Sequence, residues 1–195
     1  YYLKEFEDDS SCAGISVFHS HSPYSEAYKI AEEACESGKQ KMKELKLETA
    51  AFIDFHIGQG AVGESLEKIR ELENGNVISR PWLMWSKPEI DPNNIVNVTT
   101  YNDVEKIMNL LNKLARSNVK NLGSIAKQSN YELIMELKRI RAHQSKEIKE
   151  DEVWDEILQN LENNEEKTRG IIYDLAQSYD FWFDTQEIDK DKEKE

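Results

Sequence analysis

The sequence is poor in cysteine, in proline and in long apolar runs. Its 195 residues include two cysteines and four prolines. No apolar run approaches the roughly 20 residues that a membrane-spanning helix needs, so we expect no membrane partner. Both cysteines, Cys12 and Cys35, stand in apolar patterns. This predicts buried free thiols in a protein of the reducing cytoplasm, not a disulfide framework.

Positive charge is also scarce. Lys and Arg number 25 against 38 Asp and Glu, which gives a formal net charge of −13. Such a charge opposes strong direct binding to nucleic acid or to an anionic membrane, although it leaves room for a local basic groove. With 38% hydrophobic and 32% charged residues, the composition is typical of a globular protein of one large or two small domains.

Residues 12–57 read as strand, helix and strand. Residues 12–19 and 50–57 are short apolar runs rich in β-branched and aromatic residues, which favours buried strands. Between them, Ser22 as N-cap and Pro23 at the first helical position predict the start of a long helix. Its predicted apolar face consists of Tyr24, Ala27, Tyr28, Ala31, Ala34, Cys35, Met42 and Leu45. Strands joined by a helical crossover are parallel neighbours, or are separated by another strand of the same sheet.

The region after this unit contains turns and one further apolar run. The spacing Gly58-x-Gly60-x-x-Gly63 matches a dinucleotide fingerprint, but no second unit of this kind follows, so a plain turn is favoured. Leu66, Ile69 and Leu72 indicate a short helix. Residues 77–85 predict another strand or an edge segment, because Pro81 cannot donate to a central ladder.

The composition changes after a segment rich in Pro and Asn. We expect a linker at residues 87–99, a helical domain at residues 100–183 and a disordered acidic tail at residues 184–195. The helical domain is predicted to hold helices capped by Thr100, Ser117 and Asn130, followed by helices at residues 152–161 and 168–183.

Four residues at the ends of the two predicted strands suggest a metal site. Side chains alternate along a strand, so His19 and His21 would share one face, and Asp54 and His56 would share another. If these pairs converge, they suit zinc or manganese. The alternative, a strand-end loop with structural hydrogen bonds, is favoured because no third ligand pair with a known spacing is present.

Lysines at the end of the long helix suggest a nucleotide contact. Lys39 or Lys43 could reach a nucleotide phosphate as a point charge. The alternative is a solvated helix end, where cations complement the helix dipole.

Several short motifs follow one another in a distinctive order. They are Cys12–Val17, Ser22–Tyr28, Ala31–Ala34, Phe52–His56 and Ser79–Trp82, with weaker members at Tyr173–Leu175 and Tyr179–Trp182. Together they resemble the second palm domain of the large subunit of type III CRISPR effector complexes. In that family the helix ends in a lysine, where this chain has Lys39, although Gly38 replaces the more usual alanine. The resemblance is good over roughly the first 85 residues and loose over the helical remainder.

The resemblance implies a ferredoxin-like palm that binds ATP and, in active members, makes cyclic oligoadenylate as an antiviral alarm. That chemistry needs two divalent ions, Mg²⁺ or Mn²⁺, held by carboxylates that include a Gly-Gly-Asp-Asp hairpin. The given sequence has no such motif, and Asp8 and Asp9 lack the preceding glycines. No metal ligand is therefore carried over from the family. Lys39 alone matches a family nucleotide contact, as a partner of the triphosphate.

The resulting expectation is an α+β chain in which residues 1–86 form part of a ferredoxin-like palm/nucleotidyl cyclase sheet, followed by an α-helical domain. Because the first residue is Tyr and not Met, we expect a preceding palm half or a partner subunit to supply the carboxylates, within an RNA-guided complex. The leading interpretation is a nucleotide-binding palm protein of CRISPR-type defence, inactive in the given sequence alone. One alternative is a catalytically inactive structural or regulatory palm module. The other is a metal-dependent hydrolase.

Overall fold

The computed structural model describes residues 9–58, 63–74, 77–87, 98–163 and 165–182. The chain divides into two compact units, residues 1–104 and 105–195, and each buries its own set of apolar side chains. None of the helices in the described ranges combines the length and the apolar character needed to cross a membrane.

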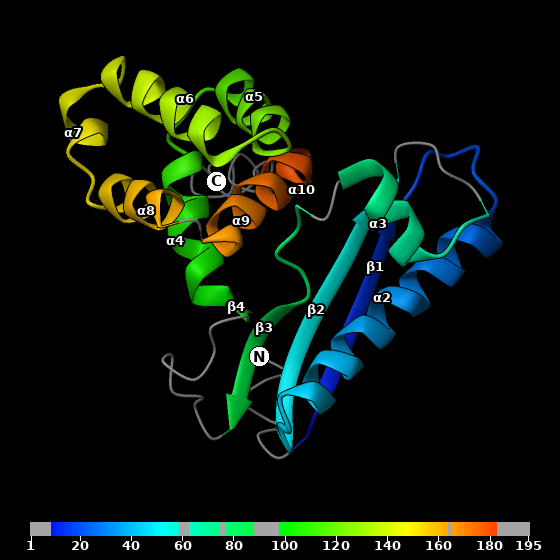
Figure 1. The fold of residues 1–195 in the computed structure, drawn as a ribbon. Helices are drawn as coiled ribbons and strands as arrows, with labels where there is room; N and C mark the ends of the chain where they lie inside the picture. Colours follow the sequence, from blue (N-terminus) through cyan, green and yellow to red (C-terminus); the bar gives the residue numbers. More distant parts are fainter. Residues whose placement is uncertain (1–8, 59–62, 75–76, 88–97, 164, 183–195) are drawn as a thin grey trace, which may run out of the picture. The chain divides into compact units, whose positions relative to one another are not determined.

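The first unit is built on one mixed sheet (Figure 1). Its elements are β1 (Ser11–Val17), α2 (Tyr24–Glu44), β2 (Thr49–Ile57), α3 (Leu66–Asn74), β3 (Trp82–Lys87), β4 (Thr99–Thr100) and the start of α4 (Tyr101–Leu111). The described strands lie in the order β1-β2-β3-β4. β1 and β2 are parallel, β3 is antiparallel to β2, and β4 is parallel to β3. The α+β class is confirmed, and the first two predicted strands are direct parallel neighbours.

Helix α2 packs closely against β1 because the residues at the contact are small. A Cβ on Gly14 would lie only 1.9 Å from the carbonyl oxygen of Ala31, so no other residue fits without moving the helix. Ala34 and Gly38 are buried on the same helix. The Ser16 hydroxyl donates to the carbonyl oxygen of Ala27 at 2.6 Å, and this bond also links β1 to α2. Figure 1 shows α2 running along β1 and β2.

The N-terminal turn of α2 differs from the prediction in two ways. Tyr24 and Tyr28, predicted on the apolar face, are 83% and 58% exposed. The close approach to β1 admits only small side chains, so the bulky tyrosines lie on the solvent side. The N-cap is Pro23 and not Ser22, so the helix begins one residue later than predicted.

The rest of the first unit packs two apolar clusters between the sheet and its helices. One consists of Ala50, Phe52, Leu83 and Val98, and the other of Ile30, Ala34, Leu66 and Ile69. Strand β3 begins only after Pro81, which has no N–H group to donate, so the strand predicted from residue 77 is shorter than expected. Cys12 and Cys35 are free thiols, half-buried where β1 meets α2.

The second unit is helical in its described residues. Besides the end of α4, it contains α5 (Arg116–Ala126), α6 (Asn130–Ala142), α7 (Lys146–Lys149), α8 (Val153–Glu162), α9 (Glu166–Gln177) and α10 (Tyr179–Trp182). Helices α5 and α9 approach closely at Gly123, where a Cβ would lie 2.6 Å from that of Ala176. The short helix α7 is not predicted from the sequence.

Helix starts in this part of the chain follow the capping pattern with shifts of one or two residues. Thr100 accepts a hydrogen bond from the Asp103 amide at 3.3 Å, as predicted for a cap. The N-cap of α6 is Ser129 and not Asn130, and that of α5 is Ala115 and not Ser117. The predicted tail at residues 184–195 and most of the predicted linker lie outside the described residues.

Candidate functional site

The two histidines that follow β1 lie together on the surface. His19 and His21 are both exposed, and their ring centroids are 5.3 Å apart. The amide of Ser22 donates to the carbonyl oxygen of His19 at 2.9 Å, which closes the turn before α2. The structure therefore brings this predicted pair together.

The other predicted pair, on β2, is buried. Asp54 is 0% exposed and His56 is 1% exposed. Asp54 is held by Arg70 of α3, whose Nη2 donates to Oδ1 at 2.6 Å and whose Nη1 donates to Oδ2 at 3.1 Å. Both oxygens of this carboxylate are thus engaged by a guanidinium group, the fork geometry that arginine favours with carboxylates.

Burial controls the protonation of His56. Its pKa falls from 6.5 to about 4, chiefly because burial disfavours the charged ring, and next because Arg80 and Arg70 lie nearby. The carboxylate of Asp54 acts in the opposite direction. The ring of Phe18 lies 6.1 Å from that of His56, centroid to centroid. His56 is accordingly neutral at neutral pH.

A second buried arginine organises the segment before β3. Arg80 donates to the carbonyl oxygen of Phe55, and its guanidinium carbon lies 4.1 Å from the centroid of the Phe55 ring. The Trp82 ring meets the same phenyl ring edge-on at 5.1 Å. Residues 80–82 therefore surround Phe55 with a cation on its face and an indole at its edge, both favourable aromatic geometries.

Sequence reasoning missed the roles of Arg70 and Arg80. A signal for Arg70 was present, since it follows Leu66 by four residues and so shares a helix face with it. A cation on the buried face of an amphipathic helix needs an anion facing it, and Asp54 is the acidic residue of the adjoining strand. For Arg80, no local pattern indicated a contact with a residue 25 positions away.

The predicted metal set does not form one group. Within the described ranges, no three or more His, Cys, Asp or Glu side chains are arranged to hold a metal ion. His19 and His21 are exposed, whereas Asp54 and His56 are buried and Asp54 pairs with Arg70. The geometry therefore gives no support to a metal centre made of these four residues.

The two predicted nucleotide-contacting lysines lie toward the other end of α2. Both are near Glu36: Lys39 Nζ is 3.4 Å from Oε2, and Lys43 Nζ is 4.0 Å from Oε1. The hydrogen bond with Glu36 raises the pKa of Lys39. About 22 Å of helix axis separate Lys39 from Tyr24 at the start of α2, taking about 1.5 Å per residue. These lysines and the histidines before α2 cannot contact the same small ligand.

The glycine-rich motif is described at its two ends, Gly58 and Gly63. A Cβ on Gly58 would lie 2.9 Å from the Phe18 ring, and Gly63 has a φ of 90°. The first amide of α3, on Leu66, donates to the carboxylate of Glu33 at 2.5 Å. A carboxylate of α2 already satisfies the amide that a phosphate would need at this helix start. Gly60 lies outside the described residues.

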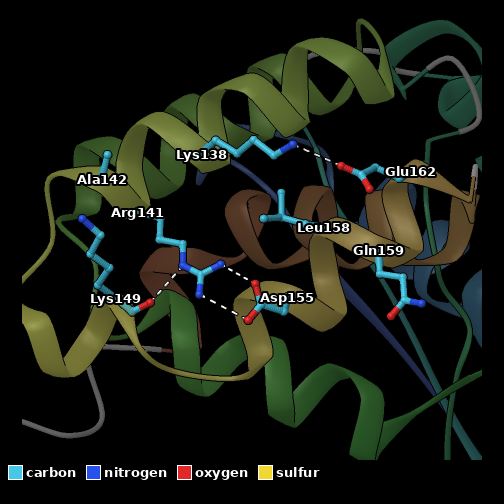
Figure 2. Close-up of a pocket in the computed structure, with 8 residues that line it drawn as sticks. All are labelled: Lys138, Arg141, Ala142, Lys149, Asp155, Leu158, Gln159 and Glu162. Carbon is cyan, nitrogen blue, oxygen red and sulfur yellow. Dashed lines mark hydrogen bonds and ion pairs between the residues drawn. The ribbon is translucent and has the colours of Figure 1, made fainter.

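The second unit carries a charged groove between α6 and α8 (Figure 2). Its volume is about 430 Å³, and it is lined by Lys138, Arg141, Ala142, Lys149, Asp155, Leu158, Gln159 and Glu162. Two ion pairs cross it: Lys138 to Glu162 at 3.1 Å, and Arg141 to Asp155 at 2.5 Å. The hydrogen bond from Arg141 lowers the pKa of Asp155. No feature of the sequence analysis indicated this groove, because its residues come from separate helices.

Comparisons with models of protein families, with curated proteins and with solved structures found no match to this chain. Any function proposed for it therefore depends on the motifs of the sequence and on the geometry of the two units.

Proposed function

We propose that this chain is part of a nucleotide-binding palm-domain protein of CRISPR-type antiviral defence, which in its intact form makes cyclic oligoadenylate from ATP with Mg²⁺ or Mn²⁺. The observation that carries the proposal is the β1-α2-β2 unit, a parallel strand pair with its crossover helix. The motifs on which the resemblance depends lie in this unit and in the strand after it.

Those motifs have physical roles in the sheet, which supports the proposal. Gly14, in the Ala-Gly motif of β1, is a point where α2 approaches the sheet too closely for a side chain. Arg80 and Trp82, in the Arg-Pro-aromatic motif, enclose Phe55 of the second motif strand. A resemblance spread over three segments thus corresponds to one packed arrangement.

The nucleotide contact would involve Lys39, with Lys43 one helical turn further on. Both side chains are mostly exposed, at 52% and 78%, and they share the single carboxylate of Glu36. Exposed ion pairs of this kind are weak because water screens them. A triphosphate carries more charge than Glu36 and would replace it as the partner of the two lysines.

ATP binding by the full chain tests this proposal. Equilibrium dialysis with labelled ATP, in the presence of Mg²⁺ or Mn²⁺, should detect binding that Lys39→Ala weakens about tenfold, as expected for the loss of one charge-assisted contact. The matched control is Lys68→Ala, because Lys68 is also exposed and pairs with Glu71 one turn away. ATP binding that is absent, or equally affected by both substitutions, would argue against a nucleotide site at Lys39.

A second function, an inactive structural or regulatory palm module, is favoured by the burial of Asp54. This acidic side chain of β2 is engaged by Arg70 and is not directed to a ligand. ATP turnover by the intact protein distinguishes the two functions, since the active form needs a carboxylate hairpin that the given sequence lacks. We expect no metal-dependent ATP turnover by this chain alone. Robust turnover by this chain alone would contradict the expectation that the catalytic carboxylates lie outside the given sequence.

A further inference from the structure

The groove between α6 and α8 contains an arginine whose direction is fixed by the main chain. The Nε of Arg141 donates to the carbonyl oxygen of Lys149 in α7 at 2.9 Å. Its Nη1 and Nη2 donate to Asp155 at 2.5 and 3.3 Å (Figure 2). Because one side of the guanidinium group is anchored to a backbone atom, its two terminal nitrogens are already directed into the groove.

The two terminal nitrogens of Arg141 form a fork, and the Asp155 carboxylate that occupies it is much more exposed than the arginine. The side chain of Asp155 is 72% exposed, whereas that of Arg141 is 22% exposed. A rotation of Asp155 into solvent would leave the guanidinium in place, since its bond to Lys149 does not involve the carboxylate. An anion of similar geometry could then take the same two donors.

Two lysines add positive charge to the lining of the groove. Lys138 pairs with Glu162 across the groove, with 51% and 56% of the side chains exposed. Lys149 lines the groove and has no ion pair in the part of the chain that the structure describes. Three cations therefore face two carboxylates, and the lining has an excess of one positive charge in a chain of net charge −13.

We infer that this groove binds a small molecule through a phosphate monoester group, which replaces Asp155 on the guanidinium of Arg141. The Lys149 side chain, which lies beside Ala142, turns toward the bound phosphate and contacts it. A phosphate monoester carries about −1.5 to −2 charges at neutral pH and offers three acceptor oxygens. A ligand with a carboxylate group would replace the single negative charge of Asp155 with another single negative charge. It would supply no additional charge for Lys149. Leu158 and Ala142 give the same groove an apolar wall for the organic part of the ligand.

The site is separate from the proposed nucleotide contact. All its residues belong to the second unit, whereas Lys39 and Lys43 belong to the first. Binding in the groove can therefore be tested without reference to the palm-domain proposal, and either proposal can fail alone.

The test is a titration of the full chain with phenyl phosphate, followed by ¹H–¹⁵N NMR that includes the Nε–Hε signal of Arg141. We expect saturable shifts of this signal and of groove amides. Asp155→Asn should tighten binding about threefold or more, because the competing charge is removed. The matched control is Glu156→Gln on the same helix, which changes the net charge equally but removes the partner of Lys106, outside the groove.

Two further substitutions address the cations without requiring the loss of Arg141. Lys149→Ala keeps the backbone carbonyl that anchors Arg141, and it should weaken phenyl phosphate binding about fivefold. Lys146→Ala on α7, a side chain 85% exposed and outside the groove lining, is its control and should leave binding unchanged. Arg141→Lys keeps the charge but loses the fork, so binding should weaken about tenfold or more.

Several outcomes would overturn the inference. They are an absence of saturable shifts, equal tightening by Asp155→Asn and Glu156→Gln, and equal weakening by Lys149→Ala and Lys146→Ala. Benzoate that binds as tightly as phenyl phosphate would also overturn it, since the site would then not select a phosphate. Tightening by Asp155→Asn alone, together with weaker binding of benzoate, would support it.

Discussion

Arg70 of α3 and Asp54 of β2 form a buried, two-pronged ion pair, with nitrogen–oxygen distances of 2.6 and 3.1 Å. Their side chains are 9% and 0% exposed, although they lie 16 positions apart in the sequence. The same Nη2 atom also donates to the carbonyl oxygen of Phe55 at 3.1 Å. The pair therefore fixes the position of α3 on the sheet, while the cost of desolvating both charges limits its net contribution to stability.

Loss of Arg70 alone should be strongly destabilising. Arg70→Met leaves the carboxylate of Asp54 buried without its cation, and we expect the free energy of unfolding to fall by about 3–5 kcal/mol. Urea denaturation followed by circular dichroism and tryptophan fluorescence measures this change. The double substitution Asp54→Leu with Arg70→Met should recover much of the loss, because it removes both charges.

The control for this prediction lies on the exposed side of the same helix. Lys68 pairs with Glu71 at 2.7 Å, with about half of each side chain exposed. Lys68→Met should therefore change the free energy of unfolding by no more than about 1 kcal/mol. Equal effects of Arg70→Met and Lys68→Met would show that burial of the Asp54 pair does not matter.

His56 should make stability depend on pH in the acidic range. Its pKa is about 4 in the folded chain and near 6.5 when unfolded, since burial and the nearby Arg80 and Arg70 oppose protonation. Between these values the unfolded state binds a proton that the folded state does not. The free energy of unfolding should therefore decrease as the pH falls from about 6.5 to 4, by up to about 3 kcal/mol.

Urea titrations at several pH values across this window test the prediction. His56→Gln should make the pH dependence less steep, whatever its effect on stability at neutral pH. His21→Gln is the matched control, because His21 is exposed in the turn before α2. The prediction fails if both variants keep the slope of the unsubstituted chain.

The sequence predicted the elements of the first unit better than their contacts. Apolar runs and the crossover helix were sufficient to place β1 and β2 in one sheet, because a connection of this kind has few geometric solutions. Their direct parallel pairing was one of two alternatives, and the structure shows it. The partner of Asp54 was not predicted, because it comes from a later helix. The place of Arg70 on the apolar face of α3 indicates a buried cation, but it does not specify which strand that cation faces.

Helix α2 illustrates a second limit of periodicity. Tyr24 and Tyr28 fit the spacing of an apolar face, yet they are exposed. Spacing alone does not encode how near the sheet approaches, and here the absence of a side chain on Gly14 sets that distance. The groove of the second unit was missed for a related reason, since Arg141 and Asp155 come from different helices.

Gly14 should not tolerate even one added methyl group. In Gly14→Ala, the new Cβ would meet backbone atoms of Ala31 and Cys35 at 1.9 and 2.4 Å, so α2 must shift away from β1. We expect destabilisation of about 3 kcal/mol or more, at the upper end of the overpacking range. Thermal or urea unfolding measures it. Ala13→Val, at the exposed neighbouring position, is the control and should have little effect.

The N-cap of α6 offers the most closely matched comparison in the second unit. The side chain of Ser129 accepts a hydrogen bond from the amide of Glu132 at 3.2 Å, whereas Ser145, the N-cap of α7, makes no such bond. Ser129→Ala should thus lower the free energy of unfolding by about 1 kcal/mol, and Ser145→Ala by a few tenths.

The comparison separates the hydrogen bond from the residue type, because both substitutions replace a serine at the same kind of helix position. Urea unfolding of both variants, followed by circular dichroism, gives the two free energies under identical conditions. A loss confined to Ser129→Ala would assign the stabilisation to the two bonds between the Ser129 hydroxyl and Glu132, one from the amide at 3.2 Å and one to the carboxylate at 3.1 Å. Equal losses would mean that the serine at each N-cap acts through its backbone preference, and that the contact at 3.2 Å contributes nothing measurable.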